Sequence, residues 1–358
     1  MQDEKSALMY GLRPSSIRPS NEVAYESTPI ISVVIPSYRV TAHILDVIKR
    51  IPDSVSHILV IDDACPDQSG RFVEDNCQDP RVTVLRHEQN QGVGGAVLTG
   101  FKLAEKFKSD VIIKVDGDGQ MDPALADTFA EPILSGEADY VKGNRFFYLD
   151  AAQSMPVLRR IGNLGLTFIS RFSTGYYSTS DPTNGYVAIS GPLAKNLPIE
   201  KLSKRYFFET DLLFRINTLG GVVVEIPHAA FYGEETSHLN ASKEFFTFFK
   251  KNVSTYFKRL FYQYILRDFN LGSLLLFGGA TLGTAGLLGV IFAAFESWTT
   301  GEPRSGGALA ILEVQIILSA IFLVGFLNFD VSREPKKPIT PRLTRRHAKP
   351  LVQYDDET

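Results

Sequence analysis

Two long apolar runs near the C-terminal end restrict what this 358-residue chain can fold into. Residues 271–295 contain no charged side chain, and residues 308–329 contain only Glu313. At about 1.5 Å of rise per residue, helices of these lengths cross a hydrocarbon core of roughly 30 Å. Soluble helices rarely stay uncharged for so long, so a buried core hairpin is the weaker interpretation. The sequence predicts a transmembrane hairpin, in which Glu313 near the outer end is structural.

The residues that flank the two runs predict their orientation. The connection 296–307 holds one basic residue, Arg304, whereas the segments before and after the hairpin are rich in Lys and Arg. Because cytoplasmic flanks carry the excess of Lys and Arg, both termini and the large N-terminal region are expected in the cytoplasm. Gly279 and Gly283 form a small-xxx-small pair, which predicts close packing within the hairpin or in a homo-oligomer.

The region before the hairpin alternates between strand-like and helix-like segments. This alternation predicts an α/β domain with a mostly parallel sheet and helices on both faces. The expected strands are 31–35, 57–61, 82–86, 111–115, 139–142, a strand within 181–190, and 221–226; the expected helices are 41–51, 67–77, 91–107, 157–172 and 209–218.

The segment 243–268 interleaves aromatic and basic residues directly before the first apolar run. Such a stretch suits the headgroup region of a membrane, so we expect amphipathic interfacial helices there rather than helices that only pack on the domain. The net charge of −3 gives no case for nucleic acid as a partner. Cys65 and Cys77 lack the spacing of a metal set and are expected to be free thiols.

Polar turns follow several of the expected strands. The most informative is Asp116-Gly117-Asp118-Gly119-Gln120, directly after an apolar strand. Ligands of open α/β sheets bind at the carboxyl ends of strands. Paired carboxylates there suit a hard divalent cation, which in turn suits a phosphate-bearing substrate.

Together these turns resemble the inverting family-2 glycosyltransferases with the GT-A fold. Within that family, residues 116–120, Gly143-Asn144-Arg145 and Thr183-Asn184-Gly185-Tyr186 look like the dolichol-phosphate-mannose synthase group. That group transfers a sugar from a nucleotide donor to a polyprenyl phosphate. The resemblance covers about residues 31–240 and implies the GT-A domain (29–240). Together with the patterns above, the expected organisation is a flexible tail (1–28), that domain, interfacial helices (241–268), a membrane hairpin (269–330) and a basic cytoplasmic tail (331–358).

The resemblance also implies roles for single residues. The donor nucleotide would contact Pro36, Tyr38, Asp62, Asp63, Asp116 and Gln120. Mg²⁺ or Mn²⁺ would be held by Asp116, Asp118 and Gln120, where it offsets charge on the departing nucleoside diphosphate. Asp118, Arg145 and Asp211 are the expected catalytic residues.

Phosphate of the acceptor lipid is expected to meet arginines, whose planar fork of donors matches phosphate oxygens. The candidate arginines are Arg145, Arg159 and Arg160. The resemblance adds Ser237 and His238, because relatives place a loop that contacts phosphate or metal at this point of the chain. A phosphate monoester with a second pKa of about 6 is largely ionised at neutral pH and needs no base. A sugar hydroxyl would need one, and Glu209 or Asp211 could supply it, although acids in a first helical turn are also favoured by the helix dipole alone.

Three other functions fit the sequence less well. A polysaccharide synthase of the same family would carry Gln-x-x-Arg-Trp, but the one Trp here, Trp298, lies at a membrane boundary. A sugar nucleotidylyltransferase would need a Gly-rich basic loop after the first strand, where this chain has Pro36-Ser37-Tyr38-Arg39. A non-enzymatic scaffold would have no use for both Asp116 and Asp118.

Overall fold

The structure is a computed structural model that describes residues 28–145, 147, 157–228 and 241–345. Its centre is a seven-stranded sheet in the order β3-β2-β1-β4-β6-β5-β7. The strands are β1 (Ile31–Ser37), β2 (His57–Asp62), β3 (Val82–Arg86), β4 (Val111–Lys114), β5 (Tyr140–Asn144), β6 (Val187–Ser190) and β7 (Val223–Pro227). Each predicted strand is present within one or two residues of its expected bounds.

One strand departs from the parallel arrangement. β6 is antiparallel to both β4 and β5, whereas every other pairing is parallel. The reason lies in the connection that precedes it. The chain leaves β5 at the carboxyl edge of the sheet, forms α7 (Val157–Thr174) beyond that edge, and re-enters the sheet from the same side. The turn before β6 therefore lies beside the end of β4, where Lys114 pairs with Val187.

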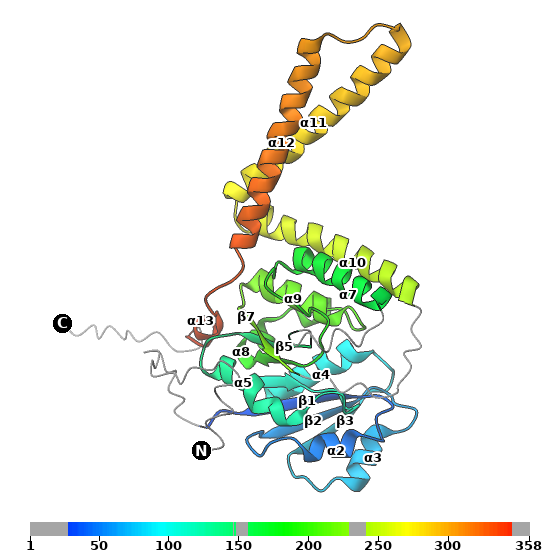
Figure 1. The fold of residues 1–358 in the computed structure, drawn as a ribbon. Helices are drawn as coiled ribbons and strands as arrows, with labels where there is room; N and C mark the ends of the chain where they lie inside the picture. Colours follow the sequence, from blue (N-terminus) through cyan, green and yellow to red (C-terminus); the bar gives the residue numbers. More distant parts are fainter. Residues whose placement is uncertain (1–27, 146, 148–156, 229–240, 346–358) are drawn as a thin grey trace, which may run out of the picture.

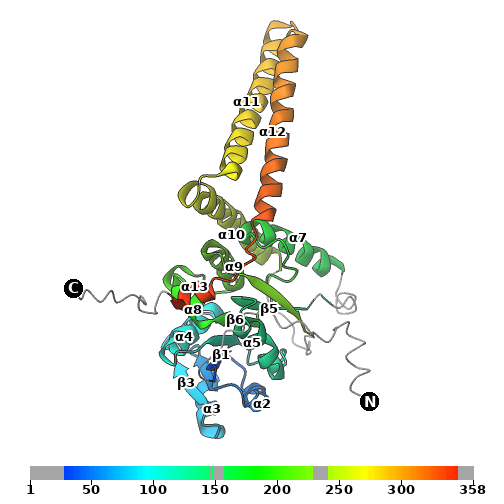
Figure 2. The same ribbon diagram turned by 90° about the vertical axis from the view of Figure 1, so that its left-hand side faces the viewer.

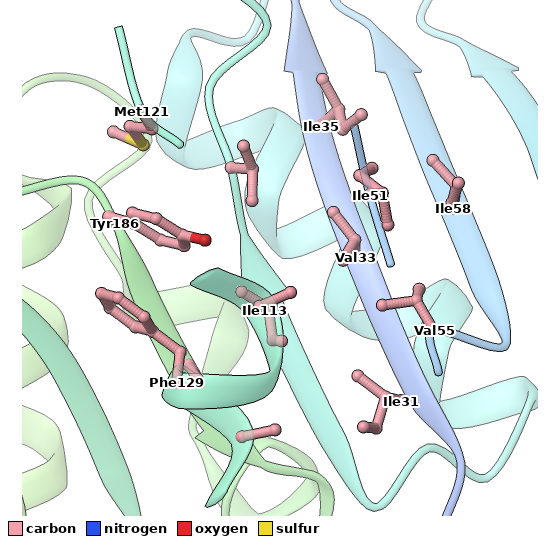
Figure 3. Close-up of a cluster of buried hydrophobic side chains, with 14 of the residues drawn as sticks. Ile31, Val33, Ile35, Ile51, Val55, Ile58, Ile113, Met121, Phe129 and Tyr186 are labelled. Atoms are coloured by element: carbon pink, nitrogen blue, oxygen red, sulfur yellow. The ribbon is translucent and has the colours of Figure 1, made fainter. Parts of the chain in front are cut away.

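Helices cover both faces of the sheet, as predicted (Figure 1). One core cluster packs β1, β2 and β4 against α2 (Ile44–Lys49), α3 (Ser69–Asn76) and α5 (Ala126–Leu134). Figure 3 shows this cluster, in which the rings of Phe129 and Tyr186 stack with centroids 3.9 Å apart. The opposite face packs against α4 (Val93–Lys106), α8 (Gly191–Asn196) and α9 (Phe208–Leu219). Short 3₁₀ turns, η1 (Pro123–Leu125) and η2 (Ile199–Lys201), complete the connections.

A layer of helices separates the sheet domain from the hairpin. α10 (Ala241–Phe261) packs on α7 and α9 and continues into a π-helical turn, η3 (Tyr262–Leu266). One side of α10 is buried, including Asn252, Thr255 and Leu260, while Phe246 and Phe257 remain 73% and 63% exposed. The side of α10 that packs on the domain carries both polar and apolar residues, and the opposite side leaves aromatic rings exposed.

The hairpin projects away from the α/β domain (Figures 1 and 2). Its helices are α11 (Leu271–Thr300) and α12 (Gly306–Ser332), both long and apolar enough to cross a membrane. Only 11% of the most apolar window of each is buried, unlike the core helix of a soluble protein. Small residues let the helices approach closely: a Cβ added at Gly279 would lie 2.9 Å from Leu323, and one at Gly283 2.6 Å from Ser319 Oγ. Both glycines of the predicted small-xxx-small pair face the partner helix of the same hairpin.

A buried ion pair joins the base of the hairpin to the helical layer. Arg259 of α10 donates two hydrogen bonds, of 2.7 and 2.6 Å, to the carboxylate of Asp330 on α12. The hydroxyls of Tyr177 and Tyr264 donate to the same carboxylate at 2.5 and 2.7 Å. Both members of the pair are almost completely buried. Arg259, expected among the exposed basic residues beside the membrane, is therefore an internal residue.

After the hairpin the chain returns to the amino edge of the sheet. Residues 333–339, which we call the strap, lead to α13 (Thr340–Arg345) beside α8. The buried carboxylate of Asp139, just before β5, accepts hydrogen bonds from the backbone N–H groups of Val222, Ile339 and Thr340. Ile339 and Leu343 pack against the core cluster that α4, α8 and α9 form with the sheet.

Candidate active site

Two adjoining cavities lie at the carboxyl edge of the sheet. The first, of about 500 Å³, is bordered by the ends of β1 and β2 and by the start of α4. The second, of about 420 Å³, is bordered by the end of β4, the turn before β6 and the start of α9. They share four lining residues: Val93, Asp116, Asp118 and Tyr206. The paired carboxylates predicted from the sequence therefore form a common wall between two spaces.

The local sequence explains this placement. β4 ends at Lys114, and the chain turns through Gly119, whose φ of +78° is a conformation that favours glycine. Within the turn the N–H of Gln120 donates to Asp118 Oδ1 at 3.0 Å. Gln120 itself lines the second cavity only. This hydrogen bond between a backbone N–H group and a side chain of the same turn stabilises the turn. The carboxylates of Asp116 and Asp118 both remain partly exposed at the boundary between the cavities.

A buried lysine stands behind the carboxylates. Lys114 Nζ lies 2.8 Å from Asp116 Oδ1, 3.7 Å from Glu209 Oε1 and 3.0 Å from the carbonyl oxygen of Gly185. Burial alone would lower the pKa of Lys114, but the neighbouring carboxylates, first Asp116 and then Glu209, hold it above its usual value. The ammonium therefore stays charged and fixes the position of Asp116.

Glu209 is the acid that α9 presents to the second cavity. It lines that cavity and is 9% exposed. Burial raises the pKa of Glu209, and the ammonium groups of Lys114 and Lys142 oppose that rise. Asp211, predicted as catalytic, lines neither cavity: its carboxylate accepts the N–H of Ser203 at 2.8 Å and lies 3.4 Å from Arg215. Of the two acids, Glu209 lines one of these two cavities and Asp211 lines neither.

The first cavity contains most of the residues predicted for the nucleotide. Pro36, Tyr38 and Asp63 line it, together with Asn90, Arg205 and Tyr206. Asp63 is nearly buried, and its carboxylate accepts the N–H groups of Gln91 and Gly92 at 2.8 and 2.7 Å. Asp63 therefore also holds the Gly-rich start of α4 against the cavity. Gly92 is required there, because its φ is +86° and an added Cβ would lie 2.6 Å from the Lys204 carbonyl.

Asp62 is not brought to either cavity. Its two carboxylate oxygens accept the backbone N–H groups of Cys65 and Gly70, at 2.7 and 2.8 Å. An added Cβ at Gly70 would lie 2.8 Å from the Asp62 carboxylate, so the loop before α3 closes tightly over it. The geometry gives Asp62 a structural position behind the donor residues. Cys65 and Cys77 are both free thiols, as predicted.

Arg145 lines the second cavity and is fixed by a buried acid. Its Nε and Nη2 atoms donate to Asp181 at 2.8 and 3.0 Å. Burial by itself would raise the pKa of Asp181, but the Arg145 guanidinium and the Lys142 ammonium outweigh it and hold that pKa below its usual range. The guanidinium thus remains charged and oriented at the cavity wall.

Behind the pair of Arg145 and Asp181 lies the polar turn 183–186, which the sequence analysis singled out only through the family resemblance. Asn184 Nδ2 contacts both Asp181 Oδ2, at 3.0 Å, and His228 Nε2, at 2.8 Å. Lys142 Nζ donates to the Asn184 carbonyl at 2.6 Å. Burial lowers the pKa of Lys142 to about 8, although Asp181 and Glu209 act in the opposite direction. The turn before β6 is therefore tied to β5 and β7 on both sides.

Some predicted acceptor residues lie outside what the structure describes. Arg159 and Arg160 belong to α7, but their side chains are not among the described atoms. Ser237 and His238 fall outside the described residues. Their predicted contact with a phosphate stays a prediction.

Lys114, Lys142, Tyr206 and His228 were not predicted as site residues. Lys114 and Lys142 have a signal in the sequence, because each is a lone cation in a strand whose neighbours are apolar or small and whose two faces are buried. Tyr206 and His228 lie in loops and follow no recognisable motif. Their position depends on how α9 and β7 close the edge of the sheet.

The chemistry of the shared wall suits a divalent cation. Asp116 and Asp118 offer hard oxygen ligands, and Gln120 adds an amide oxygen beside them. Among the described residues no group of three or more His, Cys, Asp or Glu side chains is arranged to hold a metal. Mg²⁺ is commonly held by one or two carboxylates together with substrate phosphates and water, so two carboxylates at an open cavity fit that mode.

Comparison with known proteins gives the chain its family. Residues 32–196 match Glycosyl transferase family 2. A UDP-N-acetylglucosamine–dolichyl-phosphate N-acetylglucosaminyltransferase of Methanococcus voltae is 30% identical over 221 residues, which cover 57% of this chain and 87% of that protein. An undecaprenyl-phosphate mannosyltransferase of Micrococcus luteus is also 30% identical, over 55% of this chain and 82% of its own length.

A solved structure agrees in fold. Mannosyl-3-phosphoglycerate synthase from Rubrobacter xylanophilus superposes with a TM-score of 0.52 at 17% identity, over 68% of this chain and 77% of that one. Such a likeness shows the architecture alone, whereas the sequence relatives are matched over most of their length. The chain therefore belongs to glycosyl transferase family 2, alongside relatives named for transfer to polyprenyl phosphates, and is a glycosyltransferase.

Proposed function

We propose that the protein transfers a sugar, with inversion, from a nucleotide-diphosphate donor to a polyprenyl phosphate at the cytoplasmic face of a membrane. The observation that carries this proposal is the common wall of Asp116 and Asp118 between two cavities. One cavity suits the nucleotide and the other suits an anionic acceptor. The two polyprenyl-phosphate transferases that share 30% identity support the choice of acceptor.

Asp116 and Asp118, with Gln120 beside them, would hold Mg²⁺ or Mn²⁺. Bound there, the ion supplies positive charge that stabilises the departing nucleoside diphosphate. Lys114 lies behind Asp116 and would assist indirectly. Its ammonium group neutralises charge on one oxygen of the Asp116 carboxylate and fixes that carboxylate in the wall between the two cavities. Tyr38 and Asp63 line the space for the base and ribose of the donor.

The phosphate of the acceptor lipid is already ionised when it binds, so it can act as the nucleophile without a general base. A phosphate monoester has a second pKa of about 6, so one of its oxygens can attack the anomeric carbon without losing a proton first. The new carbon–oxygen bond forms as the bond to the diphosphate oxygen breaks, and the electron pair leaves with the nucleoside diphosphate. Arg145, oriented by Asp181, would bind the acceptor phosphate in the second cavity.

The position of α10 supports a lipid acceptor. Phe248 of this helix lines the second cavity, so the same helix that carries exposed aromatic side chains also forms part of the site wall. Interfacial aromatic residues are typical of segments that lie at the headgroup level. A phosphate at the end of a membrane-embedded chain could then reach Arg145 without leaving the membrane surface. The excess of Lys and Arg on both flanks of the hairpin supports the cytoplasmic side.

A second candidate function uses a carbohydrate hydroxyl as the acceptor. Glu209 favours it, because this acid lines the second cavity and burial raises the pKa of its carboxyl, which makes the carboxylate a stronger base. In the lipid-phosphate reaction Glu209 instead balances the charges of Lys114 and Lys142. The two functions differ in what Glu209→Gln does: it abolishes hydroxyl glycosylation but leaves a substantial rate with an ionised phosphate acceptor.

The test uses full-length protein in lipid nanodiscs with Mn²⁺ and radiolabelled UDP- or GDP-sugars. Polyprenyl phosphate, polyprenol and an oligosaccharide are offered as alternative acceptors. We expect label to enter the lipid phase only with polyprenyl phosphate, and Asp116→Asn to lower the rate by at least 100-fold. Asp75→Asn, an exposed acid on α3, is the matched control. Equal transfer to polyprenol, or transfer to the oligosaccharide alone, would contradict the proposed acceptor.

A further inference from the structure

A third cavity, of about 950 Å³, lies at the base of the hairpin, and we call it the juxtamembrane cavity. Its wall is formed by the end of α9, by the residues between η3 and α11, and by the strap with the start of α13. It shares no lining residue with either cavity of the active site. The proposed reaction therefore gives it no role.

The side chains that line the juxtamembrane cavity are strongly biased in charge. Five of them are cationic: Arg267, Arg333, Lys336, Lys337 and Arg342. Two are acidic, Asp268 and Glu334. The chain as a whole carries a net charge of −3, so this excess of positive charge is a local feature.

Both acids are engaged within the chain. Asp268 accepts hydrogen bonds from Arg333 Nη1 at 3.2 Å and from Asn270 Nδ2 at 3.1 Å. Glu334 accepts the backbone N–H groups of Tyr177 and Ser178, at 3.1 and 3.2 Å. Asp268 thus balances Arg333, and Glu334 is taken up by backbone N–H groups, so neither acid pairs with Lys336, Lys337 or Arg342.

Three of the five cationic residues that line the juxtamembrane cavity have side chains without a partner among the described residues. Lys336, Lys337 and Arg342 are exposed, and none of their side chains has an ion-pair or hydrogen-bond partner among the residues that the structure describes. They stand on a segment that is anchored at both ends, by the Asp330 network above and by Asp139 below. The backbone thus holds the three cations at one place, while no described residue pairs with their side chains.

The cavity lies at the height where the hairpin leaves the domain. Arg267 precedes α11 by four residues, and Ser332, the last residue of α12, is part of the cavity wall. Figure 2 shows the strap running from α12 down to α13 directly below the hairpin. With the hairpin in a bilayer, the cavity opens at the level of the lipid headgroups.

From these observations we infer that the juxtamembrane cavity binds the phosphate of an anionic membrane lipid. Lys and Arg are the side chains that bind phosphate, and basic pockets beside membrane helices suit lipid headgroups. Three unpartnered cations around a space large enough for a headgroup supply both charge and room. The lipid would bind between the strap and α9 and would hold the domain against the membrane, independently of the acceptor bound at Arg145.

The test measures lipid binding to the full-length protein in detergent micelles by native mass spectrometry. Dioleoyl phosphatidylglycerol is titrated against the wild-type protein and the double variant Lys336→Gln/Lys337→Gln, with dioleoyl phosphatidylcholine and inorganic phosphate as separate arms. Each cation near a lipid phosphate contributes roughly fivefold in affinity, so the double variant should bind phosphatidylglycerol about 25-fold more weakly. Lys250→Gln/Lys258→Gln, two exposed lysines of α10 outside the cavity, removes the same charge and should change affinity less than twofold.

The outcomes separate the possible ligands. One saturable phosphatidylglycerol per protein, lost in the strap variant and kept in the α10 variant, supports the inference. Equal weakening in both double variants would show general charge attraction and overturn it. Tight binding of inorganic phosphate without lipid binding would also overturn it, because the ligand would then be a soluble anion. The strap lysines are exposed and unpaired, so an unchanged melting temperature without lipid is expected and confirms that the variant folds.

Discussion

Replacement of Asp330 by Asn tests how firmly the hairpin is joined to the domain. In the wild-type protein Asp330 accepts two hydrogen bonds from Arg259 and one each from Tyr177 and Tyr264. The side chains of Arg259 and Asp330 are 1% and 2% exposed, so water cannot replace a lost partner. Burial alone would lower the pKa of Arg259, but the hydrogen bonds that its guanidinium donates to the Asp330 carboxylate raise it. The guanidinium therefore stays charged and depends on its carboxylate.

The expected magnitude follows from this burial. Breaking one side of a buried ion pair costs about 3–5 kcal/mol, because it leaves an uncompensated charge. At about 2–4 °C per kcal/mol, Asp330→Asn should lower the melting temperature in detergent micelles by roughly 10 °C. Replacing both partners, Arg259→Met with Asp330→Leu, removes the charges together and should cost less than either single change; the remaining cost comes from the hydroxyls of Tyr177 and Tyr264, which lose their acceptor.

The matched control lies at the other end of the hairpin. Arg304 and Glu296 also form an ion pair, but their side chains are 30% and 42% exposed. Glu296→Gln should therefore change the stability by less than about 1 kcal/mol. If Asp330→Asn melts within 2 °C of the wild-type protein, or if the double variant is as unstable as the single one, the reasoning from buried charge is wrong.

Three further predictions concern the cavities. Gly185→Ala places a Cβ 2.5 Å from Lys114 Nζ and 3.0 Å from Asp116 Oδ2, and should lower the transfer rate by at least tenfold in the labelled-sugar assay because both groups must shift at the wall shared by the two cavities. Lys142, with a pKa of about 8, should lose its charge as the pH rises through that value, so the KM for polyprenyl phosphate should increase above pH 8; Lys142→Met should show a raised KM without this step. Asp63→Asn turns an amide donor toward the N–H of Gly92 and should cost about 1–3 kcal/mol of stability with a weakened donor affinity, measured by thermal shift with and without nucleotide.

Much of the architecture could be predicted because its signals are local. The strands and helices follow from apolar periodicity and turn residues, and the hairpin follows from length and absence of charge. The reversed direction of β6 could not be predicted in this way, since it depends on α7 packing against α9 and α10 instead of crossing the sheet. Direction in a sheet is a property of the connection in space, which the periodicity of a single strand does not contain.

The site shows the same division. Asp116 and Asp118 could be predicted because a strand end and a glycine-containing turn place them at one edge. The choice between Glu209 and Asp211 could not, because positions i and i+2 of a helix point in nearly opposite directions and α9 is buried on almost all sides. Arg259 belongs to the aromatic and basic segment 243–268, a pattern typical of a membrane interface, and its burial could not be predicted because its partner Asp330 lies 71 residues away.

The link between Asp139 and the strap has a consequence for the order in which the protein is made. The carboxylate of Asp139 is fully buried, yet its partners at residues 339 and 340 are synthesised 200 residues later, after both hairpin helices. At about 5–20 residues per second, the sheet domain waits at least ten seconds with this edge incomplete. The nascent chain must accordingly deliver its hairpin to the membrane while the enzyme domain is still unfinished. Completion of the fold is thus one of the last events in the biogenesis of this protein and follows the synthesis of its anchor.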